Sequence, residues 1–481
     1  MKSSTEVSTT DEDLAKYLLR NLDIKYHSKR ELLYLYDVET CLWKPYKSHS
    51  ILKTHFTSIL DVLFDTIIDR DERSEKQSLI RESRKQNSIL SSLSCHVLAL
   101  DDDEFIENNF DMMLGFFPIA DNKVVNLKTN IVIDRKKEHY FTKTTQRTHL
   151  SSPDYEFVRG YLKEVLCTNS ESYVDYVLGS IGYSLTGENS LKRLFILQGP
   201  KDTGKSLFIK LLQEISGCFG MIANDRVFKK SKNESCHDED TFSLLGSRIA
   251  FISEMDESNS FNETLMKKIS GNDGVTLRHC AGVNKSVLLN SVMWLATNTI
   301  PKFSDEAFQE RLRRIEFKRV FENNAGKKAE VLDKVDDFFT ICIEFSEKFY
   351  NNDCLIEDVQ EVISSTEQLI DSADSIKMFW NDQDIFEITG EAPGVCYNQN
   401  CSKKSDIYFN YCEWVQAAGK FKIEGKKPFY SKTEQIYLNE LREYKKLFWS
   451  GIVKIKEEIL SITDNLPTDE THKRYHIKNI I

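Results

Sequence analysis

The sequence predicts an α/β fold built on a parallel β-sheet. Three short apolar runs, 194–197, 249–252 and 292–296, have the length and composition of buried parallel strands. A glycine-containing loop follows the first run, and residues 206–215 then place apolar side chains on one helical face. A strand, a glycine loop and a helix in this order are typical of a nucleotide-binding α/β domain.

The loop carries the pattern Gly-x-x-x-x-Gly-Lys-[Ser/Thr] of a phosphate-binding P-loop. It reads Gly199-Pro200-Lys201-Asp202-Thr203-Gly204-Lys205-Ser206. Glycines let the backbone approach a phosphate closely, and the N-terminus of the following helix directs N–H groups and a positive dipole at it. We expect Lys205 to reach the β- and γ-phosphates of ATP and Ser206 to bind Mg²⁺. The alternative, a chance glycine turn, is disfavoured by the flanking strand and helix.

Length and composition indicate a multidomain globular protein. The chain has 481 residues, enough for about three domains, with 40% hydrophobic and 29% charged residues. It contains no apolar run long enough to span a membrane, and residues 1–6 do not resemble a secretory signal. The 11 scattered cysteines suit free thiols in a reducing compartment. These features predict a soluble, intracellular protein.

The net charge of −11 excludes a globally basic nucleic-acid-binding surface. Any contact with DNA must therefore come from a local patch or a channel lining.

The first 150 residues predict a flexible tail, 1–12, and an α+β domain, 13–150. A hairpin is expected at 32–43, a helix at 51–67 and short strands between 117 and 135. The acidic run 101–104 has two interpretations, a metal site or the first turn of a helix. We favour the helix turn because no second set of ligands lies beside it.

Polar residues follow the second and third predicted strands. Glu254 comes just after the second strand, where P-loop ATPases need a carboxylate beside Mg²⁺ and the attacking water. Asp256 and Glu257 are alternatives for this general base, and each could instead cap the next helix. Asn298 follows the third strand and could sense the γ-phosphate or simply form a turn before Pro301.

A basic segment follows, with Arg311, Arg313 and Arg314. One of these arginines could stabilise charge on the transferring phosphoryl group, and the others would then belong to a basic strand edge.

The motifs taken together resemble superfamily 3 helicases, and most closely the poxvirus-, phage- and plasmid-type primase-helicase branch. The similarity rests on the P-loop, Glu254, Asn298 and Arg311 in this order, and on three further segments. These segments are 126–129, 176–187 and 265–278, the last matching K-x-[LI]-[ST]-G-x-D-x-[IV]-x-x-R. The resemblance covers about residues 120–450.

This resemblance implies an AAA+-like ATPase core that assembles into a hexameric ring. In it Gly199, Gly204, Lys205 and Ser206 hold ATP and Mg²⁺. Glu254, also near Mg²⁺, activates water, and Asn298 acts as sensor. Arg311 resembles the arginine finger that contacts ATP bound to the neighbouring subunit, with Arg313 and Arg314 as weaker candidates. The family also places a channel-facing hairpin between 278 and 286.

On that hairpin the DNA-contacting residues would be Arg278, His279 and Lys285. The alternative for His279 and Lys285 is an ordinary solvated loop.

The same resemblance implies the domain order. A helical segment at 151–190 leads into the ATPase core at 191–325, followed by a helical connector at 326–380 and a winged-helix-like domain at 381–481. Lysines of a basic wing would be Lys420, Lys422, Lys426 and Lys427. Tyr408, Tyr411 and Trp414 are spaced for a helix core. Cys396 and Cys401 lack a second pair of ligands, so free thiols are favoured over zinc.

Two departures from the family stand out. The P-loop has Lys201-Asp202-Thr203 where glycine or asparagine is usual, and no acid pair of a primase domain is evident before the core. We therefore expect priming to come from a separate primase or polymerase chain.

The sequence thus predicts an ATP- and Mg²⁺-dependent DNA helicase for a viral, phage or plasmid genome, acting on single-stranded and forked DNA. Its location would be the host cytoplasm or a viral replication site, with the virion also possible. The alternatives are another AAA+ motor for packaging or remodelling, or a replication initiator or scaffold protein that does not hydrolyse ATP.

Overall fold

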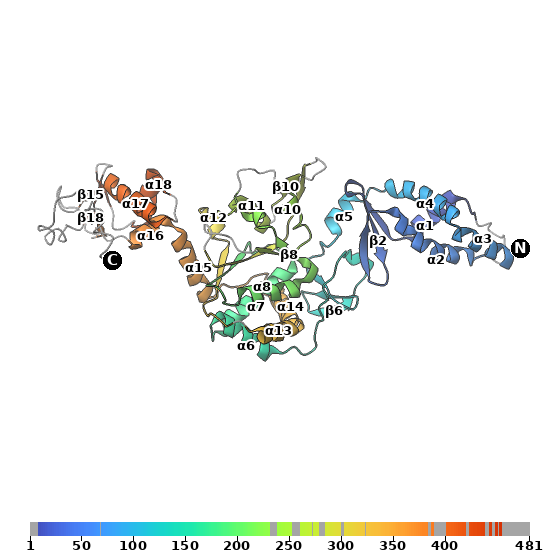
Figure 1. Cartoon of the computed structure of the whole chain (residues 1–481), viewed down its shortest axis with the longest axis horizontal. Coiled ribbons are helices and arrows are strands. Elements are labelled where there is room, and N and C mark those ends of the chain that lie inside the picture. Colours follow the sequence, from blue (N-terminus) through green and yellow to red (C-terminus); the bar gives the residue numbers. More distant parts are fainter. Residues whose placement is uncertain are drawn as a thin grey trace. The chain divides into compact units, whose positions relative to one another are not determined.

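The fold is taken from a computed structural model of the chain (Figure 1). The residues it describes are 8–67, 69–230, 238–252, 260–271, 273–278, 284–299, 303–322, 324–382, 386–388, 401–419, 423–437, 442–444, 448–450 and 452–454. The chain divides into two compact units, Met1–Glu367 and Gln368–Ile481. The boundary between these units falls inside the predicted connector 326–380.

The centre of the first unit is a five-stranded parallel sheet, which confirms the predicted α/β class. Its strands are β7 (Leu194–Gln198), β8 (Gly220–Ala223), β9 (Ile249–Ile252), β12 (Val292–Thr297) and β13 (Leu312–Glu316). They lie in the order β13-β7-β12-β9-β8. Every neighbouring pair is parallel, so all five strands end at the same edge of the sheet. β12 separates β7 from β9, which brings the ends of these three strands together.

Helices bury one face of this sheet. They are α6 (Tyr155–Leu166), α7 (Glu171–Thr186), α8 (Lys205–Ser216), α13 (Ala325–Asp333) and α14 (Val335–Asn351). Phe195, Phe251 and Trp294 of the sheet belong to one hydrophobic core with these helices. Figure 1 shows α6, α7, α13 and α14 gathered on the same side of the sheet. The burial of aromatic side chains stabilises this packing, because each removes a large apolar area from water.

Between the strands the chain forms smaller elements. They are α9 (Asp225–Phe228), α10 (Asp238–Phe242), α11 (Glu263–Ser270), α12 (Glu306–Gln309), β10 (Val275–Arg278) and β11 (Asn284–Val287). β10 and β11 pair as an antiparallel hairpin, in which Leu277 lies opposite Lys285 and Arg278 opposite Asn284.

The N-terminal part contains the predicted hairpin and short strands, a helix within the predicted range 51–67, and further elements. Its elements are α1 (Asp11–Asn21), β1 (Ile24–His27), β2 (Leu32–Asp37), β3 (Leu42–Tyr46), α2 (Lys53–Phe64), α3 (Arg70–Arg81), α4 (Ser83–Leu98) and α5 (Asp103–Asn109). The paired strands β2 and β3 confirm the hairpin expected at 32–43. A second sheet, β4 (Phe116–Pro118), β5 (Lys123–Asn126) and β6 (Ile131–Asp134), confirms the short strands expected between 117 and 135.

A buried arginine joins this second sheet to the core. Arg248 donates to the carbonyl oxygens of Leu185, 2.7 Å away, and Phe116, also 2.7 Å away. Its guanidinium also lies over the rings of Phe117 and Phe219. The charge is thus buried with hydrogen-bond partners, as a buried charge must be.

The second unit has its own small core. Helix α15 (Gln360–Ala373) leads into α16 (Ser375–Asp382), β14 (Phe386–Ile388), β15 (Cys401–Lys403), α17 (Lys404–Ala418), α18 (Lys426–Ile436), β16 (Arg442–Tyr444), β17 (Phe448–Ser450) and β18 (Ile452–Lys454). β15, β17 and β16 form an antiparallel sheet in that order, and β14 pairs with β18. Tyr411 is buried and Tyr408 and Trp414 pack beside it, which confirms that these aromatics form a helix core.

Candidate functional site

The loop between β7 and α8 requires glycine at its first position. A Cβ atom on Gly199 would lie 1.9 Å from the carbonyl oxygen of Phe317, so no side chain fits there. Phe317 is held in place because its N–H donates to the carbonyl oxygen of Gln198, 2.8 Å away. At the end of the loop Gly204 has a φ of 92°, a left-handed conformation that suits glycine.

The lysine of the motif lies within the loop. Lys205 is buried, and its Nζ donates to the carbonyl oxygens of Gly199 at 2.7 Å and Pro200 at 2.5 Å. It also lies 3.1 Å from the hydroxyl oxygen of Thr203. The ammonium group therefore sits in the concave side of the loop, where a bound phosphate could replace these carbonyl oxygens as its partner.

The unusual Asp202 is accommodated by a left-handed backbone. Its φ is 60°, a conformation that aspartate adopts more readily than most residues. Its carbonyl oxygen accepts a hydrogen bond from the N–H of Phe321, 2.8 Å away. This bond ties the loop to the segment that follows β13, so the loop is held at both ends.

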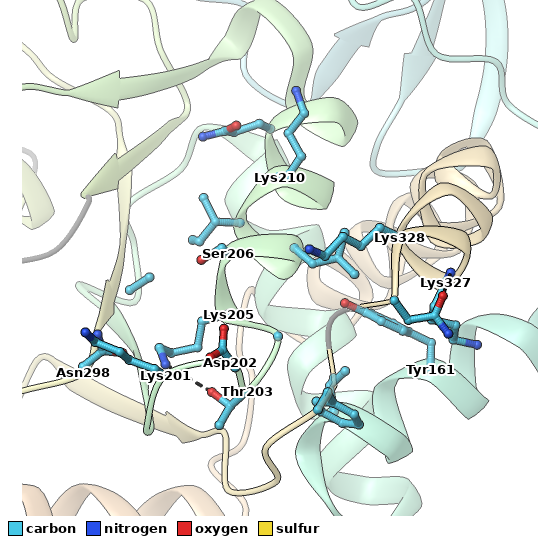
Figure 2. A pocket seen from close by; sticks show the side chains of 18 of the residues that line it. Tyr161, Lys201, Asp202, Thr203, Lys205, Ser206, Lys210, Asn298, Lys327 and Lys328 are labelled. Atoms are coloured by element: carbon cyan, nitrogen blue, oxygen red, sulfur yellow. Dashed lines mark hydrogen bonds between the residues drawn. The ribbon is translucent and has the colours of Figure 1, made fainter.

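A large pocket opens beside the loop, with a volume of about 1710 Å³. Residues 201–206 form its floor, and β9, β12, α6 and the start of α13 supply its walls. Figure 2 shows Asn298 and Lys201 at one end of the pocket and Tyr161 and Lys327 at the other. Parallel α/β sheets bind their ligands at this edge, where neighbouring strands lead in different directions.

The ends of two neighbouring strands lie in the pocket wall. Ile252 ends β9, and Asn298 follows β12 directly. The candidate base Glu254 and its alternatives Asp256 and Glu257 lie outside the described residues. β9, the strand that leads to these carboxylates, nevertheless ends beside β12, because Ile252 pairs with Leu295 of β12. β12 is the neighbour of β7, the strand that precedes the P-loop.

The three candidate arginines lie away from this pocket. Arg311 precedes β13, whose first residue pairs with the first residue of β7, so it lies at the opposite edge of the sheet from the loop. At roughly 3.3 Å per residue the two edges are about 20 Å apart. The Nη1 of Arg311 donates to the Lys267 carbonyl oxygen at 3.0 Å and to the Ser270 hydroxyl at 2.7 Å.

The other two arginines are more fully engaged. The Nε of Arg313 donates to Asp358 at 2.9 Å. The Nη2 of Arg314 lies 2.7 Å from Glu316. By contrast, the Nη2 of Arg311 has no hydrogen-bond partner among the described residues.

The predicted hairpin is present as β10 and β11. The backbone of Arg278 and of Lys285 lies in these strands, and their side chains lie outside the described atoms. His279 falls in the connecting segment 279–283, which is also outside the described residues.

The end of the pocket farthest from Asn298 includes residues that the sequence did not single out as functional. The hydroxyl of Tyr161 on α6 is buried and has no hydrogen-bond partner in the described part of the chain. Burial raises the pKa of this phenol, and Glu164 adds to the effect. Lys327 and Lys328 lie in the first turn of α13. No local sequence motif distinguishes Tyr161 from other apolar residues of the predicted helical segment 151–190.

The acidic run 101–104 leads into α5, whose first turn contains Asp103 and Glu104, as the favoured interpretation predicted. Asp102 accepts from the Lys25 ammonium at 2.7 Å, and Asp103 accepts from the Ser28 N–H at 2.6 Å at the start of α5. No cluster of three or more metal-ligating side chains occurs within the described ranges. Cys396 and the side chain of Cys401 lie outside them.

The candidate basic wing is described in part. Lys426 lies in the first turn of α18, with its ammonium 5.7 Å from the ring centre of Tyr408, and Lys427 is exposed. Lys420 and Lys422 lie outside the described residues. None of the helices described here is both long and apolar enough to cross a lipid bilayer.

Comparison with known proteins gives one significant similarity of sequence. The chain is 29% identical over 166 residues to a protein named "Putative helicase V13" from Sputnik virophage. The match covers 33% of this chain and 21% of the virophage protein, so the chain spans about a fifth of that relative's length. No protein-family model matches the sequence.

Solved structures give weaker similarities. Two apo structures of the NrS-1 C-terminal region, residues 305–718, align with TM-scores of 0.43 and 0.45 at 11% and 12% identity. Each alignment covers 93% of this chain and 100% of the solved chain. A score below 0.5 does not establish a common fold.

Proposed function

We propose that this chain is a subunit of an ATP-driven DNA helicase that serves the replication of a viral, phage or plasmid genome. The observation that carries the proposal is the preformed P-loop, which opens into a pocket shared with Asn298 at the carboxyl edge of a parallel sheet. The similarity to a virophage protein named as a helicase supports the same class of activity.

The pocket residues have the chemistry that nucleoside triphosphate hydrolysis needs. The N–H groups at the start of α8 and the Lys205 ammonium would hold the phosphates. Water would attack the γ-phosphorus as the bond to the bridging oxygen breaks, which yields ADP and phosphate. Glu254 would take the proton of that water, and Asn298 would hold the water or the γ-phosphate in line.

A Mg²⁺ ion would accompany ATP in this site. The hydroxyl of Ser206 lines the pocket directly after Lys205, so it fits an oxygen ligand for this ion. Glu254 is the proposed acid beside it. The ion supplies positive charge to the β- and γ-phosphates when bound.

Assembly into a ring, proposed as a hexamer, would bring Arg311 to the ATP of a neighbouring subunit. Arg311 lies at the opposite edge of the sheet from its own P-loop, and its Nη2 makes no hydrogen bond with a described residue. Arg313 and Arg314 are weaker candidates because acidic side chains already bind them. An arginine placed between subunits would couple hydrolysis to assembly.

DNA binding is proposed for the β10–β11 hairpin. The hairpin would place Arg278, His279 and Lys285 in the central channel, one set from each subunit. Because the chain is acidic overall, these local cations would supply the contacts to DNA phosphates. Movement of the hairpin with the nucleotide state would pull single-stranded DNA through the ring.

The second unit is proposed to be a winged-helix domain that contacts duplex DNA. Its order of helix α16, strand β15, helices α17 and α18, and hairpin β16–β17, with β17 between β15 and β16, suits that fold. Lys426 and Lys427 at the start of α18 would contact phosphate. A separate primase or polymerase would supply primers.

DNA-stimulated ATP hydrolysis tests the proposal. Wild type is compared with Lys205→Ala and Lys285→Ala, each with and without single-stranded DNA. We expect DNA to raise the wild-type rate, Lys205→Ala to abolish turnover, and Lys285→Ala to keep the basal rate but lose the stimulation. Lys16→Ala is the control, because Lys16 is exposed on α1, where it pairs with Glu12.

Two other results would point to other functions. An ATP hydrolysis rate that single-stranded DNA does not change would contradict the helicase proposal and favour a packaging or remodelling motor. ATP binding without turnover in any condition would favour a replication initiator or scaffold.

A further inference from the structure

We propose that Lys201, inside the P-loop, binds the terminal phosphate of the nucleotide in its own subunit and acts as a second catalytic cation there. The inference rests on the proposed function, since it assigns a role within the same nucleotide site. It concerns a position where the resembled family has no required residue, so the P-loop motif itself does not assign it.

The lysines of the pocket differ in their partners. Five lysines line it, and four have interactions with other groups. Lys205 donates to loop carbonyls, Lys210 lies 2.6 Å from Glu214, and Lys327 lies 3.3 Å from Glu330. Lys328 is also engaged. Lys201 alone makes no hydrogen bond or ion pair with a described residue, and its side chain is exposed in the pocket.

The backbone around Lys201 is fixed, although its side chain has no hydrogen-bond or ion-pair partner in the described part of the chain. The carbonyl oxygen of Pro200 accepts from the Lys205 ammonium, and that of Asp202 accepts from the Phe321 N–H. Lys201 therefore stands between two tethered residues at the tip of the loop. A fixed backbone with an unpaired ammonium group can bind an anion without first breaking contacts of its own.

The position of Lys201 selects the terminal phosphate. Figure 2 shows its side chain at the Asn298 end of the pocket, opposite Tyr161 and Lys327. Tyr161 gives that opposite end an aromatic surface, which suits a nucleoside. A nucleotide with its phosphates on the loop and its nucleoside at Tyr161 would have its γ-phosphate nearest Lys201.

The position of Arg311 leaves a role for a second cation, such as Lys201, at the γ-phosphate of the same subunit. Arg311 lies at the far edge of its own sheet, so it cannot reach the phosphates bound in the same subunit. As the β–γ bond breaks, negative charge develops on the γ-phosphoryl oxygens and on the leaving bridging oxygen. Lys205 and Lys201 would both stabilise that charge before any neighbour contributes an arginine.

Steady-state kinetics of Lys201→Ala test this role. We expect kcat to fall about 10-fold to 100-fold with KM changed by less than about threefold, since removing one donor to a developing charge costs rate more than binding. Lys201→Arg should recover most of the rate because it restores the charge. Lys210→Ala is the matched control, since Lys210 lines the same pocket but is paired with Glu214.

A binding measurement separates this proposal from the hydrolysis proposal. We expect the affinity ratio of a non-hydrolysable ATP analogue to ADP to fall about tenfold in Lys201→Ala, because a charge-assisted hydrogen bond to the γ-phosphate is lost. This ratio can be measured even if wild type does not turn over ATP. An unchanged ratio and unchanged kcat would overturn the assignment. An equal loss of affinity for both nucleotides would also overturn it, because Lys201 would then act on the loop and not on the γ-phosphate.

Discussion

Gly199 illustrates how a residue required by a motif is also required by packing. The motif requires glycine because a phosphate needs close approach of the backbone, and the structure adds the carbonyl oxygen of Phe317 at 1.9 Å from a Cβ atom. That second constraint comes from a segment more than 100 positions later in the chain. It explains why the start of the loop cannot accept even alanine.

We expect Gly199→Ala to lower the free energy of unfolding by about 2–3 kcal/mol and to weaken ATP binding, because the loop and the Phe317 segment must separate. Urea unfolding and nucleotide titration measure the two effects. Gly204→Ala is the matched variant, since its Cβ meets only Val165 at 3.8 Å. It should cost about 1 kcal/mol from the left-handed backbone alone. Equal losses in both variants would contradict the packing explanation.

Single residues show where prediction from sequence reaches its limit. The loop residues and Asn298 were recognisable because each follows the end of a predicted strand directly in the sequence. Tyr161 was not recognisable as a pocket residue, because its place there depends on the packing of α6 beside the loop. Nor could the sequence reveal that Lys201 pairs with none of the described residues, since its potential partners come from separate elements.

At the scale of elements, the contact between α7 and α14 depends on one glycine. A Cβ atom on Gly182 would lie 2.6 Å from the carbonyl oxygen of Cys342 and 2.8 Å from the backbone nitrogen of Ser346. The Ser346 hydroxyl also donates to the Gly182 carbonyl oxygen at 2.9 Å. The two helices therefore pack at backbone distance beneath the sheet that carries the P-loop.

We expect Gly182→Ala to destabilise the protein by about 1–3 kcal/mol, because α7 and α14 must move apart. Gly160→Ala is the opposite case. Gly160 lies inside α6 with nothing within 4 Å of its Cβ position, so alanine should stabilise by about 0.5–1 kcal/mol. The midpoints of urea unfolding compare the two. A stabilising Gly182→Ala would show that the helices do not need this close approach.

Elements were predictable where their side chains formed a strong pattern. The apolar runs at β7, β9 and β12 and the hairpin β2–β3 were expected from sequence and are present. β8 was not expected, because this four-residue edge strand is half exposed and its pattern is weak. The order of the strands, with β12 between β7 and β9, could not be read from local pattern because it depends on long-range pairing.

At the scale of the whole molecule, charge sets a condition on function. A chain with a net charge of −11 repels DNA unless cations are concentrated at particular places. The proposed places are the β10–β11 hairpin and the start of α18. The expected hexameric ring rests on the family resemblance alone, because a ring depends on surfaces that meet only between subunits.

The measurement that tests the helicase most directly is the unwinding of a labelled forked DNA duplex by the purified chain with ATP and Mg²⁺. Lys205→Ala tests whether unwinding requires ATP hydrolysis. We expect strand separation by wild type with ATP, none with a non-hydrolysable analogue, and none by Lys205→Ala. A wild type that hydrolyses ATP yet leaves the fork intact would contradict the helicase and identify a different P-loop motor.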